Sequence, residues 1–348
     1  MLRTLHLFNP WHDEALAVHR PHHIPTLASR RLAAALGDLP RWWMPPEDVC
    51  LVFPPSMLPE DATPPDWDTV GRIEPWGWDI CLVQMLRRIG APDRLLPTDG
   101  QLDRLRALSS RKTGVGLLEW LNGQRLPPGV LPGESRWCTS WSEVAEVLAQ
   151  HPDGAMLKQP WSSSGRGVFS NRGGQNAMAE ARARRCLHRQ GGIEVQRWYR
   201  READGALEFG SCESGRVEFV GCSLFSTAEN GAYAGHLIDK ADALKMRFLQ
   251  TWRQTSADAL PASVLERSLN DLIALLSEGL QRLIGGAYVG DLGVDVLFTP
   301  EGLHPCIEIN LRRTMGHVAL RMGERLPESD LPAVLTVGLE GCMLKPLS

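Results

Sequence analysis

Hydrophobic and polar residues alternate in short runs near the N-terminus, and stretches with a helical period separate these runs. Residues 2–8 (LRTLHLF) and 49–53 predict strands, because β-branched and apolar residues there are bounded by proline. Residues 28–36 (ASRRLAAAL) and 78–89 (WDICLVQMLRRI) predict helices that end before glycine. Elements that alternate in this way predict an open α/β layer over about the first hundred residues.

The rest of the chain predicts further helices and strands. Helical patterns occupy residues 101–108, 112–121, 140–150, 175–190 and 263–284. Strand patterns occupy residues 154–159, 168–171, 192–198, 206–211 and 216–225, and a hairpin occupies residues 287–310. The proline-rich segment 125–133 between two of the helices indicates a subdomain boundary.

The hairpin carries the most informative polar pattern. In YVGDLGVDVLF the apolar residues share one face and Asp291, Gly293 and Asp295 share the other, because strand side chains alternate. The return strand is expected to place on that polar face His304, Cys306, Glu308 and Asn310. If the turn is 299–302, Glu308 faces Gly293, and Asp295 lies one diagonal step away.

Carboxylates that converge on one face repel each other unless a cation or solvent compensates them. Asp295, Glu308 and Asn310 offer only oxygen ligands, which favour a hard ion such as Mg²⁺ over zinc. A solvated outer face of a sheet produces the same alternation, so the hairpin alone leaves both interpretations open. Relief of carboxylate repulsion predicts that Glu308→Gln leaves folding unaffected or slightly improved.

A second feature is the segment from Lys158 to Gly167 (KQPWSSSGRG). A lysine at a strand end is followed by a turn of hydroxyl and glycine residues, which places an ammonium and backbone N–H groups where phosphates could bind. It lacks the G-K-[ST] sequence that opens a helix in a P-loop. By itself the segment also fits an ordinary hairpin tip.

Composition narrows the class of protein. The 348 residues include 37 Lys and Arg and 41 Asp and Glu, which give a net charge of −4 and argue against nucleic acid or anionic lipid as the main partner. No apolar stretch approaches the roughly 20 residues of a membrane span. The eight cysteines form no C-x-x-C pair, and the first residues lack the core of a signal peptide, so we expect a cytoplasmic protein.

Together these features resemble the ATP-grasp superfamily, the fold of D-alanine:D-alanine ligase, glutathione synthetase and biotin carboxylase. The resemblance covers about 200 residues, from near Ser110 to His317, and reproduces the family's order of parts. It implies an α/β fold with three parts: a small N-terminal α/β domain at 1–108, a first lobe with a glycine-rich flap at 109–198, and a second lobe with the metal-binding hairpin at 199–348.

The resemblance also assigns roles to individual residues. Lys112 and Lys158 match the two nucleotide-binding lysines, and Glu194 and Val195 match the hinge at the adenine edge, where Val195 would offer backbone groups. The flap is matched by residues 162–167, which include Ser163, Ser164, Gly165 and Gly167. The metal ligands are matched by Asp295, Glu308 and Asn310, with EIN in place of E-x-N.

In that family two Mg²⁺ ions, for which Mn²⁺ can substitute, bridge the ATP phosphates to the acidic residues, and the γ-phosphoryl group passes to a carboxylate. An amine then attacks the acyl phosphate. The resemblance therefore implies an ATP-dependent ligase with small carboxylate and amine substrates, in which Lys158 and Arg312 assist transfer. A kinase, a non-catalytic nucleotide sensor and a homodimer all stay open.

Two segments depart from the family pattern. Arg200-Arg201-Glu202 occupies the region of the usual acidic ribose contact, and Glu202 is the candidate for that role. After the first strand, Asn9, His12 and Asp13 stand where ligases often have a glycine-rich turn. Because ligand groups gather at strand ends in α/β layers, these three residues are candidate substrate contacts.

Overall fold

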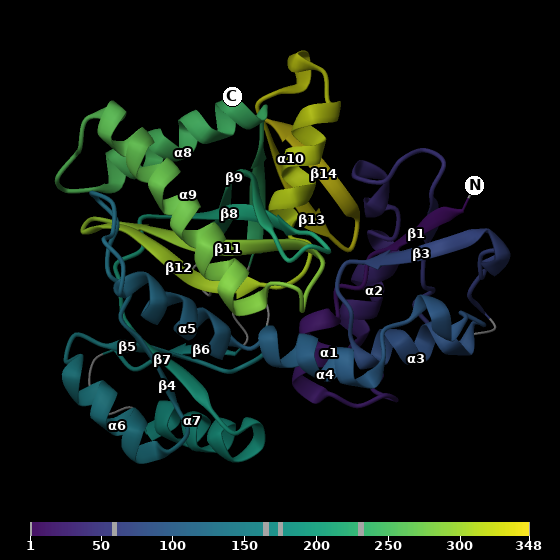
Figure 1. Ribbon diagram of the computed structural model, residues 1–348, viewed down its shortest axis with the longest axis horizontal. Helices are drawn as coiled ribbons and strands as arrows, with labels where there is room; N and C mark the ends of the chain where they lie inside the picture. Colours follow the sequence, from purple (N-terminus) through teal and green to yellow (C-terminus); the bar gives the residue numbers. More distant parts are fainter. Residues whose placement is uncertain (1, 58–60, 163–166, 173–176, 229–232, 348) are drawn as a thin grey trace.

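The computed structural model describes residues 2–57, 61–162, 167–172, 177–228 and 233–347, and its strands form three sheets (Figure 1). The sheets contain three, four and seven strands. Each sheet belongs to a different part of the chain, and the N-terminal part lies beside the seven-stranded sheet at the right of the view. Among the described residues, no helix has the length and apolar character needed to cross a membrane.

The N-terminal domain is built on a parallel sheet of order β2-β1-β3. Its elements are β1 (Arg3–Leu7), α1 (His12–Val18), α2 (Leu27–Ala35), β2 (Val49–Leu51), β3 (Val70–Pro75), α3 (Ile80–Arg88) and α4 (Asp99–Leu108), with 3₁₀ helices at Leu39–Trp42, Trp67–Thr69 and Asp93–Leu95. The sheet packs through Leu5, Leu7 and Leu82, which are fully buried. The predicted α/β layer is confirmed, although β3 and α1 were not predicted.

The first lobe contains an antiparallel sheet of order β4-β7-β5-β6. Its elements are α5 (Arg111–Asn122), β4 (Ser135–Cys138), α6 (Trp141–Gln150), β5 (Ala155–Lys158), β6 (Val168–Ser170), α7 (Ala177–Gln190) and β7 (Ile193–Arg197). α6 and α7 cover this sheet. α5 instead packs on α9 and β12, so it joins the first lobe to the second.

The second lobe contains an antiparallel sheet of order β12-β11-β8-β9-β10-β13-β14. Its elements are β8 (Ala203–Ser211), β9 (Val217–Thr227), β10 (Tyr233–Ile238), α8 (Ala241–Thr255), α9 (Ala262–Ile284), β11 (Gly290–Thr299), β12 (Gly302–Asn310), α10 (Met315–Arg325), β13 (Ala333–Gly338) and β14 (Gly341–Pro346), with a 3₁₀ helix at Glu328–Asp330. β10, α8, α10, β13 and β14 were not predicted. The two-lobed α/β architecture agrees with the predicted fold class.

One face of the seven-stranded sheet is apolar and the other is polar near its edge. α9 presents leucines at helical spacing (Leu265, Leu269, Leu272, Leu276 and Leu280), all of them buried against the sheet. The apolar residues of β11 face the same core, as alternation predicted. The opposite face of β11, which carries Asp291 and Asp295, is therefore turned away from α9.

The hairpin register differs from the prediction. Phe298 faces Leu303 as expected, but Asp295 faces Glu308 directly, and Gly293 faces Asn310. The shift arises between the pairs Leu297–His304 and Asp295–Glu308. One residue of β11 separates these pairs, but three residues of β12 do, so β12 contains two extra residues there. The same irregularity moves Cys306 from the predicted polar face into the apolar core.

A buried polar junction ties the end of β1 to the start of α3. Asn9 Nδ2 donates to Gly77 O (2.8 Å) and to Asp79 Oδ2 (3.1 Å), and His12 Nδ1 lies 3.4 Å from the same carboxylate oxygen. Asp79 also caps α3 by accepting from Leu82 N at 2.8 Å. Asn9, which is fully buried, is therefore an internal partner of Asp79 and not a substrate contact, whereas the candidacy of His12 stays a prediction.

Asp79→Ala should destabilise the protein by about 2–4 kcal/mol, because it removes a helix cap and leaves buried polar groups unpaired. The free energy of unfolding in urea measures the cost. Asp66→Ala is the matched control, because Asp66 caps a 3₁₀ helix by accepting from Asp68 N but is exposed. Equal losses in the two variants would contradict the role of the buried junction.

Candidate active site

Asp295, Glu308 and Asn310 come together at the edge of the second lobe. Asp295 on β11 and Glu308 on β12 are paired across the hairpin, and Asn310 Nδ2 donates to Asp295 Oδ1 at 3.1 Å. In this arrangement Asn310 turns its amide nitrogen toward Asp295. After rotation of the amide, all three side chains would offer oxygen atoms to a cation. The predicted convergence of these residues therefore agrees with the geometry, and the corrected register brings the two carboxylates closer than predicted.

The Asp295 carboxyl lies in an unfavourable environment for a negative charge. Burial raises its pKa well above the ordinary value, and the neighbouring carboxylates of Glu308 and Glu208 raise it further. Arg312 and the Asn310 amide oppose this shift only in part. A divalent cation bound between the carboxylates would remove the penalty, so the donor set fits Mg²⁺.

Arg111 reaches the hairpin from the first lobe. Its Nη2 donates to Glu308 Oε2 at 2.8 Å, and its Nη1 donates to Ser162 Oγ at 2.6 Å and to Gln159 O at 2.8 Å. Burial alone would lower the pKa of this guanidinium, but the carboxylates of Glu308 and Glu194 outweigh burial and raise it. Arg111 is therefore a fixed positive charge that holds the base of the predicted flap against Glu308.

Lys112, the predicted first nucleotide-binding lysine, is exposed on α5. Ser110 caps this helix, so Arg111 turns inward and the next residue, one helical step further round, turns outward. Arg111 occupies the position beside the hairpin that the resemblance gave to Lys112. Sequence reasoning missed it, although an arginine and a lysine side by side at a helix start made either residue available.

Lys158, the predicted second lysine, lies between the two lobes. It is 4% exposed, and its Nζ donates to Ile307 O at 2.9 Å and to Glu194 Oε1 at 3.3 Å. Glu194 also accepts from the hydroxyl of Ser135 at 2.8 Å. The structure thus brings Lys158 and Glu194 together, but as an ion pair beside the hairpin.

The hinge prediction for Val195 is corrected. Val195 is fully buried inside β7 and is paired with Arg136 on one side and Leu157 on the other. The strand ladder uses its backbone groups, so they are not available to an adenine. The chain leaves the sheet only after Arg197.

Glu202 lies away from the hairpin donors. Its Oε1 lies 2.8 Å from Arg200 Nε, and its backbone N–H donates to Phe298 O. Ala206 is the β8 residue that faces Asp295, so Glu202 is four residues, about 13 Å, along the strand from the donors. Its ribose role stays a prediction.

The flap can be described only at its base. Ser163, Ser164 and Gly165 lie outside the described residues. Gly167 O accepts from Gln159 N at 2.9 Å, and a Cβ on Gly167 would lie 2.3 Å from Ser162 Cβ. The two ends of the loop therefore pack so closely that only glycine fits at position 167.

A buried carboxylate that sequence reasoning missed lies behind the donors. Glu208 on β8 is 1% exposed and accepts from the hydroxyls of Ser223 (2.9 Å) and Thr314 (2.8 Å). His317 Nδ1 lies 3.1 Å from Glu208 Oε2. Burial would raise the pKa of Glu208, but His317 and the hydroxyls lower it. A charged residue within an apolar strand, GALEFG, was the available signal.

Two glycines make room for the Glu208 carboxylate. A Cβ on Gly316 or on Gly293 would lie within 2.6 Å of a Glu208 oxygen. His317 Nε2 also lies 3.0 Å from Phe209 O, so this histidine is anchored inside the second lobe at the start of α10. Burial would lower the pKa of His317, but Glu208 raises it, which favours a buried ion pair behind the hairpin.

Arg312 links the hairpin to the N-terminal domain. Its Nη2 and Nε donate to the carboxylate of Asp13 at 3.0 and 3.3 Å, and its Nη1 donates to Arg313 O at 3.1 Å. Burial would raise the pKa of Asp13, but Arg312 lowers it. Asp13 thus reaches the polar face, and His12 lines a small recess beside Asp13, Glu308 and Arg312.

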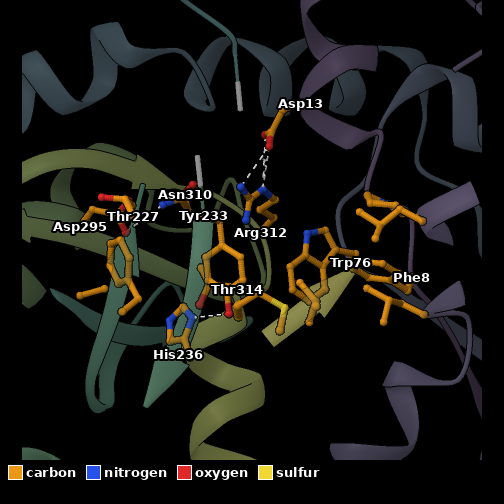
Figure 2. Close-up of a pocket in the computed structure, with 18 of the residues that line it drawn as sticks. Phe8, Asp13, Trp76, Thr227, Tyr233, His236, Asp295, Asn310, Arg312 and Thr314 are labelled. Atoms are coloured by element: carbon orange, nitrogen blue, oxygen red, sulfur yellow. Dashed lines mark hydrogen bonds and ion pairs between the residues drawn. The ribbon is translucent and has the colours of Figure 1, made fainter. Parts of the chain in front are cut away.

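A cleft of about 510 Å³ opens beside these residues, between the N-terminal domain and the second lobe. Figure 2 shows Arg312 and Asp13 at one side of the cleft, Asp295 and Asn310 next to them, and Trp76 and Phe8 on the wall of the N-terminal domain. Within the described residues, no group of three His, Cys, Asp or Glu side chains gathers as a metal site. The donor set is instead two carboxylates and an amide.

No protein-family model matches the sequence, and no curated protein matches it. Solved structures with a similar chain path include an ADP complex of N5-carboxyaminoimidazole ribonucleotide synthetase, at 14% identity over 90% of this chain and 72% of that chain, with a TM-score of 0.42. The ADP complex of the synthetase from Staphylococcus aureus has 10% identity over 96% of this chain and 82% of that chain, with a TM-score of 0.48.

A third is the biotin carboxylase domain of the Hydrogenobacter thermophilus 2-oxoglutarate carboxylase with MgADP, at 14% identity over 74% of this chain and 55% of that chain, with a TM-score of 0.46. These values are too low to transfer a function. The case for a function therefore depends on the side chains of this chain.

Asp295→Asn and Glu308→Gln should change stability in opposite directions in metal-free protein. Asp295→Asn should raise the melting temperature, because it removes a charge that burial and Glu308 disfavour. Glu308→Gln should lower the melting temperature, because it deprives buried Arg111 of its nearest carboxylate. This replaces the expectation that Glu308→Gln leaves folding unaffected.

The gain in Asp295→Asn should grow with pH. The raised pKa keeps Asp295 protonated and free of repulsion at low pH, and its ionisation as pH rises destabilises only the wild-type protein. Thermal melts of both proteins in EDTA, at pH values about one unit apart from pH 5 to 8, measure the difference between their melting temperatures. A gain that shrinks as pH rises would contradict the assignment.

Proposed function

We propose that this chain is an ATP-dependent ligase that activates a carboxylate as an acyl phosphate for attack by an amine. The observation that carries the proposal is the meeting of two lobes at one polar face. The first lobe contributes Arg111 and Lys158, and the second contributes the opposed carboxylates of Asp295 and Glu308. Cations on one side and oxygen ligands on the other suit a metal-bound triphosphate.

The residues of the chain divide the work of such a reaction. Arg111 and Lys158 are buried cations that would hold phosphate oxygens, and their hydrogen bonds to Ser162 and Ile307 fix where they point. Asp295, Glu308 and Asn310 would hold Mg²⁺. When bound, Mg²⁺ supplies positive charge that neutralises the transferring phosphoryl group.

Arg312 is placed to orient the carboxylate that is activated. Asp13 holds it on one side, and the cleft lies on the other. In the proposed reaction a carboxylate oxygen bonds to the γ-phosphorus and ADP leaves. The amine nitrogen then bonds to the acyl carbon and phosphate leaves. Arg312 would keep the carboxylate oxygen in line with the γ-phosphorus. Positioning of this kind supplies much of the catalysis in phosphoryl transfer.

Binding of ATP should depend on a divalent cation and on Asp295. Titration calorimetry with a non-hydrolysable ATP analogue should show at least about tenfold tighter binding with Mg²⁺ than with EDTA, because the metal screens phosphates from the carboxylates. Asp295→Asn should reduce this difference. Asp271→Asn removes the same charge from an exposed position on α9 and should not. Equal affinity with and without metal would refute the metal assignment.

Turnover should require two co-substrates. ADP release measured with panels of carboxylates and amines should appear only when both are present, and Glu308→Gln should slow it at least about a hundredfold, since a charge beside the transferring group is lost. ADP release with a single hydroxyl compound would identify a kinase instead. Nucleotide binding without ADP release under any combination would leave a sensor as the function.

A further inference from the structure

The cleft beside Arg312 has an apolar wall that the phosphoryl chemistry does not need. The wall comes from α2 and the residues directly after α2, β1 and β3 on one side, and from α10, β13 and the residue after β13 on the other. Its members are Phe8, Ala28, Leu32, Leu36, Trp76, Met315, Val337 and Leu339. Figure 2 shows Trp76 beside Arg312, with Phe8 beyond Trp76 on the side away from Asp295.

Charge is confined to one end of this cleft. Among the described residues, its charged lining side chains are Asp13, Glu208, Asp295, Glu308 and Arg312. They come from α1, β8, the hairpin and the segment that follows it, which is the side of the proposed phosphoryl transfer.

The remaining polar side chains further along the cleft are uncharged. Tyr233 and His236 lie 2.9 Å apart through the phenol oxygen and Nδ1, and Thr227 lies near them. Burial lowers the pKa of His236 to about 4, so the ring is neutral at pH 7. A ligand that fills the cleft therefore meets charge only at its end beside Arg312.

Arg312 has hydrogen-bonding capacity left for a ligand. A guanidinium has five N–H donors. The contacts of Arg312 with the Asp13 carboxylate and with Arg313 O use one N–H on each of its three nitrogens, which leaves two. Because both remaining donors belong to Nη1 and Nη2, a carboxylate is the group that they suit.

We propose that the cleft binds a monocarboxylic acid with an apolar aromatic or branched body, its carboxylate at Arg312 and its body against Leu32, Trp76 and Met315. The inference rests on the proposed function in one respect: this acid is the carboxylate that receives the phosphoryl group. A cleft of about 510 Å³ has room for such a molecule beside a phosphate, since ligand pockets range over roughly 300–1,000 Å³.

A second charge on the ligand would be unfavourable. A dicarboxylate of similar length would place its far carboxylate against apolar residues such as Phe8 and Leu36, which are 6% and 1% exposed, without a charged partner. Removing an ion from water without a partner is strongly disfavoured. The cleft should therefore select against dicarboxylic acids.

The test compares 3-phenylpropanoate with glutarate by titration calorimetry, with Mg²⁺ and a non-hydrolysable ATP analogue present. We expect 3-phenylpropanoate to bind at least about tenfold more tightly, and Leu32→Gln to weaken its binding about tenfold through lost apolar contact. Leu27→Gln is the matched control on the same helix, because Leu27 is 50% exposed and does not line the cleft. It should leave the affinity unchanged.

Equal affinity for the two acids, or equal effects of Leu32→Gln and Leu27→Gln in variants that melt like the wild type, would overturn the inference. The wild-type comparison decides the matter even if Leu32→Gln fails to fold. The binding test with the ATP analogue is separate from the turnover test with ATP. If 3-phenylpropanoate binds tightly but no acid and amine together give ADP release, the ligase proposal is contradicted and the acid site is retained. ADP release with other acids only would do the reverse.

Discussion

Two carboxylates held opposite each other at the edge of a sheet are the constraint on which the rest of this molecule depends. Asp295 and Glu308 are paired across the hairpin, with Glu208 buried behind them. Such a cluster is stable only with compensating positive charge. Arg111 of the first lobe pairs with Glu308, and His317 of α10 pairs with Glu208. These two contacts fix the positions of the first lobe and of α10 relative to the hairpin.

Asp295 is the member of this cluster whose charge is least compensated. Its contacts are an amide hydrogen bond from Asn310 and the more distant Arg312, which is itself engaged by Asp13. The site therefore has an unmet demand for a cation at the same place where the cleft begins. A bound metal ion would complete the charge balance of this acidic face.

The N-terminal domain contributes side chains both to the candidate active site and to the packing against the second lobe. Asp13 orients Arg312, and Phe8 and Trp76 pack on α10 and β13 of the second lobe. The same apolar contact that joins the two parts forms the wall of the cleft. In the proposed acid site, substrate preference and domain packing would be set by the same side chains, which would couple selectivity to the stability of the interface.

The period of two along β11 was enough to predict which residues face the core and which face the site. The exact partners were not predictable, because the two extra residues before Glu308 change the register without interrupting the apolar pattern. The choice of Arg111 over Lys112 depends on the rotation of α5, which its cap and its packing on α9 determine. The strand pattern shows Glu208 as a charged residue among apolar ones. Its partners Ser223, Thr314 and His317 are distant in sequence, however, so no local pattern predicts the pairing.

The most direct test of the central claim is the position of a metal ion. Crystals grown with Mn²⁺ and a non-hydrolysable ATP analogue would locate manganese by its anomalous scattering. The account predicts a peak between the carboxylates of Asp295 and Glu308, at about 2 Å from their oxygens, with the nucleotide phosphates on its other side. A nucleotide bound with no manganese at this hairpin, and with Glu308 still bonded only to Arg111, would contradict it.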